Sequence, residues 1–246
     1  MESEKHSEML SILELDIVKN GFEWLSAQQI LSVKELSSVV SAHALWKRPD
    51  PYITPLILKK EGPSWNSSVR DTARACSALA AEGIVFMASQ KWLLAEEKGN
   101  SWNEDVYDST YALGALADMG IREREGCRWL YENYGPDWEH VGTTSLIITA
   151  LKKQDTLAGC GEFREFIRER AEWVLSKKER DGGWKHISTS NLAIQALILA
   201  GFKPEVEDSV RWLLENVRES GAWGNKEDEI NATALALATL GLYNSI

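Results

Sequence analysis

Two arginines and two tyrosines recur at helical spacing in the middle of the chain. Arg70 and Arg74 lie four residues apart, and Tyr107 and Tyr111 repeat that spacing. Residues four apart share one face of a helix, so each pair presents its side chains together. Guanidinium groups donate bidentate hydrogen bonds to phosphate and carboxylate oxygens, and the four residues therefore predict a site for an anion such as a diphosphate. The alternative is that the arginines only pair with nearby carboxylates, which are Asp71, Asp108 and Asp228.

The segments that carry these residues belong to a sequence repeat. An Ala-Leu dipeptide occurs six times, and its leucines recur at intervals of 34 to 46 residues. Four of these leucines have a glycine four residues later, where a left-handed residue ends a helix. Five are preceded, by 13 or 14 residues, by a tryptophan in a Gly-containing loop. The repeat leucines are Leu45, Leu79, Leu116, Leu151, Leu197 and Leu237, and the loop tryptophans are Trp65, Trp102, Trp138, Trp184 and Trp223. A tryptophan that recurs in this way is expected to pack rather than to react.

Each repeat unit predicts a helical hairpin, because periods of this length indicate stacked supersecondary units. The outer helices are expected at residues 8–29, 52–60, 84–97, 122–133, 161–179 and 205–218. The inner helices are expected at 33–47, 67–82, 105–119, 141–153, 187–200 and 227–242. The last inner helix is as apolar as the others and needs a partner, which unit one supplies. We therefore predict an all-α fold, an (α/α)6 toroid that closes on itself, in one domain spanning residues 1–246 with a weakly defined extension at 1–20.

One face of the predicted inner helices is polar. Counting back from each repeat leucine at 100° per residue separates an apolar face, which packs on the outer helices, from an opposite face that carries polar side chains. This arrangement predicts a water-filled central cavity. Its expected lining includes Arg70, Arg74, Tyr107, Tyr111, His43, Gln195 and Asn231.

Four residues near the starts of the inner helices are candidate acids. Asp71 and Asp108 lie eight residues before their repeat leucines, where an acidic side chain more often caps a helix than catalyses. His140 and His186 each follow a loop tryptophan by two residues and could act as general acids at the mouth of the cavity. A loop histidine with a satisfied hydrogen bond is the more common case.

Composition excludes several classes of protein. The net charge of −10 disfavours a nucleic-acid partner, which normally selects a basic face. No stretch reaches the length of a membrane-spanning segment and the first residues do not resemble a signal peptide, so a cytoplasmic protein is expected. Three cysteines without a CxxC spacing support neither a disulfide framework nor a metal site.

The Gly-x-Trp loop followed by Thr-Ala and Ala-Leu resembles the repeat of squalene cyclases and of protein prenyltransferase β subunits. The resemblance covers roughly residues 20–242 and implies the α/α toroid fold and an isoprenoid ligand. Prenyltransferases bind a prenyl diphosphate with Arg, Lys and Tyr near the starts of inner helices, which is the role the resemblance implies for the Arg and Tyr pairs.

The sequence also departs from both families. Squalene cyclases protonate their substrate with an Asp of an Asp-x-Asp-Asp-Thr-Ala motif, and Arg70 stands at the position of that proton donor in residues 67–73. The prenyltransferase zinc ligands and an Asp-Asp-x-x-Asp motif are missing as well. We therefore expect no cofactor, with magnesium only if a diphosphate is bound.

Two functions remain open from the sequence. The first is a prenyltransferase- or terpene cyclase-like protein that binds or transforms an isoprenoid diphosphate. The second is a non-catalytic scaffold that binds a protein partner, as the thioester domains of complement do.

Overall fold

The computed structural model describes residues 15–245, and most of them are helical. The inner helices are α2 (Val33–Leu45), α4 (Val69–Ala81), α6 (Val106–Asp118), α8 (Val141–Ala158), α10 (Ile187–Ala200) and α12 (Glu229–Ser245). The outer helices are residues 15–26, α3 (Ile53–Leu58), α5 (Met87–Glu96), α7 (Arg124–Asn133), α9 (Arg164–Ser176) and α11 (Glu207–Glu215). Two 3-10 turns, η1 (Pro136–Trp138) and η2 (Pro204–Val206), complete the helical elements. The predicted alternation of outer and inner helices is confirmed.

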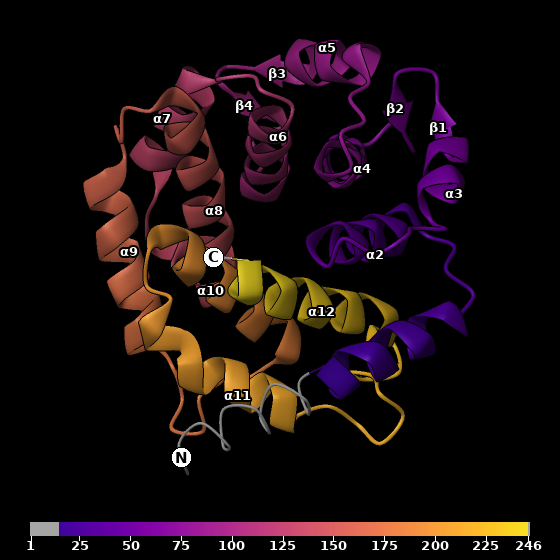
Figure 1. Ribbon diagram of the computed structural model, residues 1–246. Helices are drawn as coiled ribbons and strands as arrows, with labels where there is room; N and C mark the ends of the chain where they lie inside the picture. Colours follow the sequence, from indigo (N-terminus) through magenta and orange to yellow (C-terminus); the bar gives the residue numbers. More distant parts are fainter. Residues whose placement is uncertain (1–14, 246) are drawn as a thin grey trace.

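The inner helices pack against one another in chain order, and α12 packs against α2 (Figure 1). Three hydrogen bonds join these two helices or the residues that directly flank them. Lys34 Nζ donates to Asp228 Oδ1 over 3.1 Å, Ser38 Oγ to Asn231 Oδ1 over 2.8 Å, and the indole N–H of Trp46 to the carbonyl of Leu237 over 2.7 Å. The last inner helix thus finds its partner in unit one, as its apolar sequence requires.

The loop tryptophans link the outer helix of a unit to its inner helix through hydrogen bonds. Trp102 is fully buried, its indole N–H donates to the carbonyl of Leu93, and its backbone N–H donates to the hydroxyl of Ser109. Trp65, Trp184 and Trp223 make the same two bonds in their units. In units two and three the loop is a short antiparallel hairpin, β1 (Lys60–Glu61) with β2 (Ser64–Trp65) and β3 (Glu97–Lys98) with β4 (Ser101–Trp102). The packing role predicted for these four tryptophans is confirmed.

Unit four does not follow this pattern. Trp138 lies in turn η1, is only half-buried, and packs its ring against Trp129 with the ring centroids 5.3 Å apart. Trp138 therefore packs, as predicted for a repeat tryptophan, but it is less buried than the other four. The same unit has Asp155 where other units have a helix-ending glycine, so α8 continues to Ala158 and stops at Gly159, whose φ is +64°. This longer helix accounts for the longest interval in the repeat.

One predicted helix end is also corrected. Gly241 lies inside α12 and does not end it. A Cβ at this position would meet Nε1 of Trp46 at 2.9 Å. The residue is therefore small because α12 must approach α2 closely there, and not because the backbone must turn.

Candidate ligand-binding site

Two arginine–tyrosine stacks lie between the first two turns of α4 and of α6. The guanidinium carbon of Arg70 is 5.3 Å from the ring centroid of Tyr107, and that of Arg74 is 4.4 Å from the ring centroid of Tyr111. These distances are in the range of cation–π contacts. Both arginines lie on the face of α4 opposite Leu79, which is fully buried against the outer layer. The structure therefore brings the four predicted residues together on one inward face.

Carboxylates hold both arginines in place. Arg70 donates from Nε to Asp108 Oδ1 over 2.8 Å and from Nη2 to Asp105 Oδ1 over 3.0 Å. Arg74 donates from Nη1 to Asp71 Oδ1 over 3.4 Å. The ion pairing that the sequence offered as an alternative is therefore present. A guanidinium group has five N–H donors, so each arginine keeps donors that these bonds do not use.

The candidate acids Asp71 and Asp108 lie in the first turns of α4 and α6, where each accepts a hydrogen bond from an asparagine. Asp71 Oδ2 accepts the amide of Asn66 over 2.9 Å, and Asp108 Oδ2 accepts that of Asn103 over 2.8 Å. Asp105, which we did not single out from the sequence, caps α6 by accepting the backbone N–H of Asp108 over 2.8 Å. Its position just before the first apolar residue of the helix was the available signal.

The starts of the inner helices meet at one end of the ring. Besides the Arg70 pairs, Tyr107 Oη lies 3.1 Å from Thr143 Oγ1 of α8, and Ser188 of α10 donates to Asp228 Oδ2 over 3.1 Å. His140 and His186 occupy the N-cap positions of α8 and α10, where both are exposed and neither side chain makes a capping hydrogen bond. Both histidines thus lie at the same end as the arginines, outside the stacked cluster.

His43 does not face the axis, which corrects the sequence prediction. It is 7% exposed, its ring packs edge-on between Phe22 and Tyr52, and Nδ1 lies 2.9 Å from the carbonyl oxygen of Pro49. His43 is separated from its N-cap residue, Ser32, by the same number of residues that separates the repeat leucines of α4 and α6 from their N-cap residues. The Ala44-Leu45 pair is therefore two residues out of register, and His43 holds the buried leucine position.

The remaining predicted residues join inner helices to one another. Gln195 of α10 donates to Thr239 Oγ1 of α12 over 2.8 Å, and Asn231, 6% exposed, accepts from Ser38 at the contact with α2. Neither contacts the arginine–tyrosine stacks.

A set of leucines on the inner helices was missed by sequence reasoning. They are half-buried and stand outside the main hydrophobic core of the described residues, although they lie on the innermost helices. Leu146 and Leu192 take the positions in α8 and α10 that Arg74 and Tyr111 take in theirs, so position counting could have found them. The set consists of Leu146, Leu192, Leu199 and Leu235.

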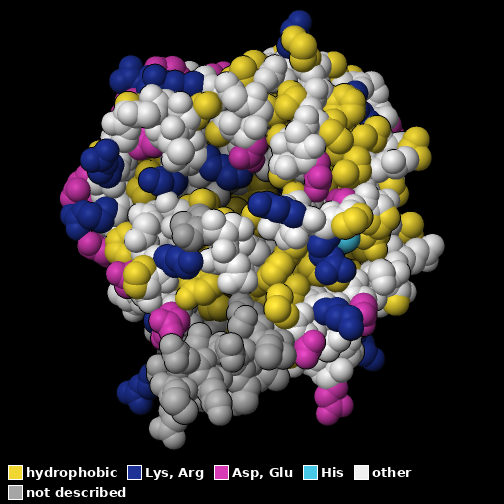
Figure 2. All heavy atoms as spheres, in the orientation of Figure 1, with side chains coloured by type: hydrophobic (Ala, Val, Ile, Leu, Met, Phe, Trp, Pro, Cys, Tyr) yellow, Lys and Arg dark blue, Asp and Glu magenta, His cyan; other side chains and the backbone are white. Residues whose placement is uncertain are grey.

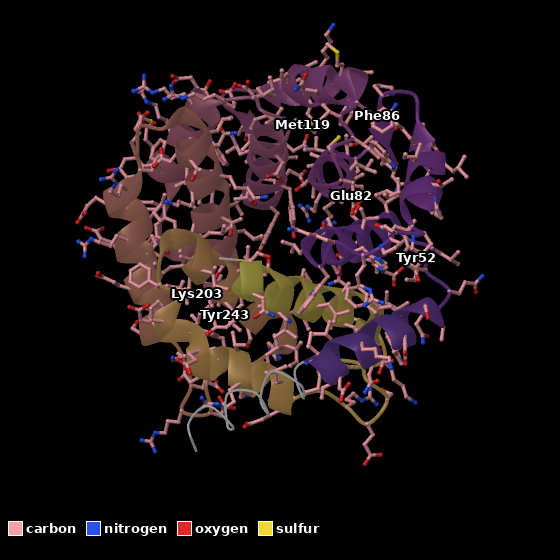
Figure 3. The ribbon with its side chains drawn as sticks, in the orientation of Figure 1. Tyr52, Glu82, Phe86, Met119, Lys203 and Tyr243 are labelled. Atoms are coloured by element: carbon pink, nitrogen blue, oxygen red, sulfur yellow. The ribbon has the colours of Figure 1, made fainter. Side chains whose placement is uncertain are left out.

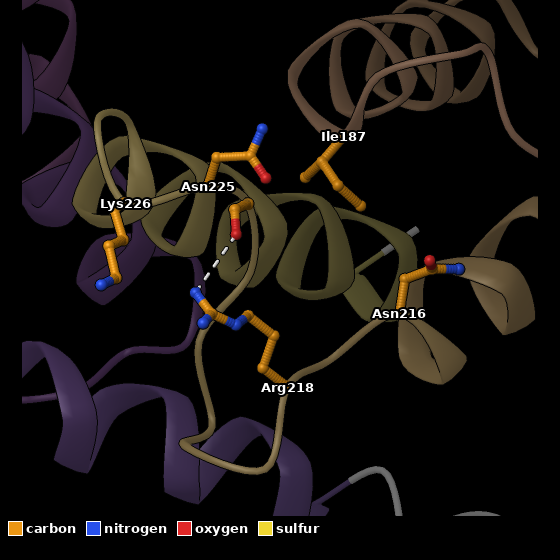
Figure 4. Close-up of a pocket in the computed structure, with 6 residues that line it drawn as sticks. Ile187, Asn216, Arg218, Asn225 and Lys226 are labelled. Carbon is orange, nitrogen blue, oxygen red and sulfur yellow. Dashed lines mark hydrogen bonds between the residues drawn. The ribbon is translucent and has the colours of Figure 1, made fainter.

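Two cavities on the described residues are lined by side chains outside the arginine–tyrosine stacks. One of about 450 Å³ lies where α10 and α12 begin and includes Asn216, Arg218 and Lys226 (Figure 4). Arg218 there pairs with Glu229 and donates to the carbonyl of Gly224. The other, of about 430 Å³, lies between the ends of α8 and α10 and the start of α9. The predicted central cavity stays a prediction.

Two of the three cysteines are buried, and the third, Cys160, is exposed. Cys76 and Cys127 are buried, and burial raises the pKa of the Cys76 thiol to about 12. No group of three His, Cys, Asp or Glu side chains among residues 15–245 could hold a metal ion. No helix in the same range combines the length and apolar character needed to cross a bilayer.

The arrangement of helices is similar to that of known proteins. No family model matches the chain. The apo structure of the type II terpene cyclase MstE from Scytonema superposes with a TM-score of 0.72 at 14% identity, covering 93% of this chain and 97% of that one. A variant of the same enzyme, in complex with geranylgeranyl dihydroxybenzoate, gives 0.71 at 13% identity over 95% and 98%. The chain has the fold of the type II terpene cyclases.

Two further matches cover only part of a larger protein. The terpene cyclase fold also occurs in ent-copalyl diphosphate synthase from Streptomyces platensis, with a TM-score of 0.67 and 16% identity over 87% of this chain and 51% of that one. A segment of 99 residues is 34% identical to terpentedienyl-diphosphate synthase of Kitasatospora griseola, and it covers 35% of this chain and 20% of that protein. The match therefore spans about a fifth of this curated relative.

Proposed function

We propose that the chain is a terpene cyclase-like protein that binds an isoprenoid with an anionic head group between its inner helices. The observation that carries the proposal is the division of the inward face into two kinds of wall. Units two and three contribute the two stacked Arg–Tyr pairs, and units four to six contribute half-buried leucines. A prenyl diphosphate has the same division between a charged head and an apolar chain.

The arginines suit the head group by position and by chemistry. Arg70 lies in the first turn of α4 with 35% of its side chain exposed, and 20% of the Arg74 side chain is exposed. Their stacking on Tyr107 and Tyr111 orients the guanidinium planes before a ligand arrives, which reduces the entropy lost on binding. Their unused N–H donors can then bond to phosphate oxygens.

The leucine wall suits the isoprenoid chain. A leucine that is half-exposed on an inner helix gains free energy when an apolar ligand removes its surface from water, by about 25 cal/mol per Å². The solved neighbour with geranylgeranyl dihydroxybenzoate shows that this fold accommodates a prenylated substrate in another protein.

The proposal assigns binding and leaves the cyclising acid unassigned. Asp71 and Asp108 each accept hydrogen bonds from an asparagine and an arginine. A cyclase that starts by protonation needs a side chain that donates instead. We therefore name Arg70, Arg74, Tyr107 and Tyr111 as binding residues only.

The proposal is tested by the melting temperature in the presence of farnesyl diphosphate. A ligand that binds only the folded state at about 100 times its Kd stabilises it by about 2.7 kcal/mol. Farnesol should raise the melting temperature much less, and the difference should shrink in the Arg70→Ala, Arg74→Ala double variant. Equal melting curves for diphosphate, alcohol and buffer at millimolar ligand would reject the proposal.

A matched control separates loss of binding from loss of an ion pair. Lys153 of α8 pairs with Asp118 of α6 over 2.7 Å, between the same kind of inner helices but near their opposite ends. Lys153→Ala removes a comparable ion pair without touching the stacks. It should leave the difference between farnesyl diphosphate and farnesol intact.

The scaffold alternative has one feature in its favour. Hydrophobic side chains gather on the face of the molecule over α3 and α5 (Figure 2). Leu58 is 78% exposed, Met87 65% and Val85 45%. Exposed apolar patches mark protein contacts more often than chance. If no prenyl compound binds, a protein that covers this patch becomes the better hypothesis.

A further inference from the structure

The cavity of about 430 Å³ lies apart from the arginine–tyrosine stacks, at the opposite ends of the inner helices. Its volume falls in the range of small-molecule sites, about 300–1,000 Å³. The side chains that matter here are Lys152, Thr156, Arg164, Ile167, Arg168 and Phe202. The cavity has no part in the function proposed above.

The lining of this cavity carries more positive than negative side chains. Asp155 is the one carboxylate in the lining; it is 7% exposed and is engaged with the backbone N–H of Phe163 at 2.9 Å. Arg168 pairs with Glu165 and Glu172. Lys152 and Arg164 make no side-chain hydrogen bond or ion pair with any residue in the 15–245 range. Two positive charges therefore border the cavity without a carboxylate partner.

The guanidinium of Arg164 lies beside Gly161 and has no ionic partner among residues 15–245. A Cβ on Gly161 would lie 2.9 Å from Nη2 and 3.0 Å from Nε of Arg164, so the guanidinium rests against the bare glycine backbone. Gly161 also has a φ of +63°, which few other residues adopt. A guanidinium that is already placed loses less entropy when it binds an anion.

The remainder of the lining is apolar. Ile167 is 4% exposed, and Phe202 is a partly buried residue packed against the core. A ligand for this cavity must therefore pair an anionic group with a hydrocarbon part. Two separate cations and the hydroxyl of Thr156 match a doubly charged tetrahedral phosphoryl group better than a singly charged carboxylate.

We infer that this cavity binds a phosphate monoester of an apolar alcohol, with the phosphoryl group between Lys152 and Arg164 and the hydrocarbon on Phe202 and Ile167. The site is independent of the head-group site proposed at Arg70 and Arg74. It would give the protein two places that recognise phosphorylated hydrocarbons.

The test is calorimetric titration of octyl phosphate into the full chain carrying Arg70→Gln and Arg74→Gln, so that the central cluster cannot contribute. Binding of one equivalent should persist in this background. Adding Arg164→Gln or Lys152→Gln should weaken it about tenfold or more, because each removes a charge-assisted hydrogen bond. Octanol and inorganic phosphate should each bind more weakly than octyl phosphate.

Arg124→Gln is the matched control, because Arg124 pairs with Glu162 outside the cavity. It should leave the affinity for octyl phosphate unchanged. The inference is overturned if octyl phosphate does not bind in the starting background, or if Arg164→Gln and Lys152→Gln bind it as tightly as Arg124→Gln. A farnesyl diphosphate effect that survives loss of Arg70 and Arg74 but not of Arg164 would support this cavity and reject the central site.

Discussion

The loop tryptophans are the residues on which each hairpin most depends. Trp102→Ala and Trp184→Ala should each lower the free energy of unfolding by about 3–5 kcal/mol, as large core truncations do. Both side chains are at most 2% exposed, and each truncation also removes the indole N–H bond to the carbonyl of Leu93 or Val174. Urea unfolding measures the change.

Trp138 provides the internal comparison. It is half-buried in turn η1, so Trp138→Ala should cost clearly less than either buried truncation. Equal costs at all three positions would show that burial in the hairpin is not what makes these residues stabilising.

His43 predicts how stability varies with pH. Burial lowers its pKa below the ordinary value of 6.5, against the opposing effects of Asp50 and of the Pro49 carbonyl. Between the lowered pKa and 6.5 the imidazole is protonated in the unfolded chain but not in the folded chain. The free energy of unfolding therefore falls as the pH drops below 6.5, until the pH passes the lowered pKa. His43→Leu, which restores the repeat residue, should flatten this fall between about pH 7 and pH 5 in urea unfolding.

The other charged groups near His43 act separately. Asp50, Arg48 and Glu82 all affect its titration, and Tyr52 and Glu82 both lie beside α2 (Figure 3). Burial raises the pKa of Asp50 above 3.8, so its own contribution falls as the pH rises, the opposite sign to that of His43. An Asp50→Asn variant should keep the loss of stability below pH 6.5. A His43→Leu variant with the wild-type pH profile would contradict the assignment.

At the scale of the helix, Asp105 both caps α6 and pairs with Arg70. Asp105→Ala loses the cap as well as the ion pair and should cost about 0.5–2 kcal/mol. Asp105→Asn keeps a capping oxygen and should cost less, because a half-exposed ion pair contributes at most about 1 kcal/mol. Urea unfolding of the two variants and the wild type gives both differences. Equal losses for Asn and Ala would show that the charge, and not the cap, sets the stability of this helix start.

The helices could be predicted from the sequence because their spacing follows simple chemistry. Three of the predicted stop residues, Gly83, Gly120 and Gly201, do have positive φ, at 75°, 80° and 97°. Unit one could not be placed from the same pattern, because its buried repeat position holds a histidine and an Ala-Leu pair happens to follow. The role of Gly241 could not be predicted either, because glycine is favoured both where a backbone turns and where two helices pack closely.

Of the proposed site, only the polar half could be predicted from the sequence. Helical spacing placed Arg70, Arg74, Tyr107 and Tyr111 on one inward face, and their stacking follows from two neighbouring helices in the same register. Asp71 and Asp108 were among the expected carboxylate partners, but Asp105 was not, because its pairing depends on how far α4 and α6 are rotated. The leucines of α8 and α10 were not predicted, because on a largely apolar helix an inward-facing leucine cannot be distinguished by type from the leucines of the core.

At the scale of the molecule, two equivalent glycines test how the ring is joined. A Cβ on Gly21 would meet Trp223 and Leu237 at 3.1 Å, across the junction between unit one and unit six. Gly21→Val should therefore destabilise the protein by about 1–3 kcal/mol, as overpacking does. Hydrogen exchange should quicken in α2 and α12 together.

Gly126→Val is the matched control within the ring. A Cβ on Gly126 would meet Trp102 and Leu113 at the same 3.1 Å, between units three and four. Its effect on hydrogen exchange should centre on α6 and α7 and leave the junction of α2 with α12 protected. Faster exchange in α2 and α12 from both variants would mean that the junction is simply the weakest part of the molecule.

The central claim is that the inward face pairs a cationic wall with a leucine wall to hold a prenyl anion. A crystal structure with a non-hydrolysable farnesyl diphosphate analogue tests it most directly. We predict density for the two phosphates beside Arg70 and Arg74, at the end of the ring where α4 and α6 begin, with the chain running along Leu146, Leu192 and Leu235. Density for the analogue only at other positions, with both arginines still bonded solely to Asp71, Asp105 and Asp108, would contradict the claim.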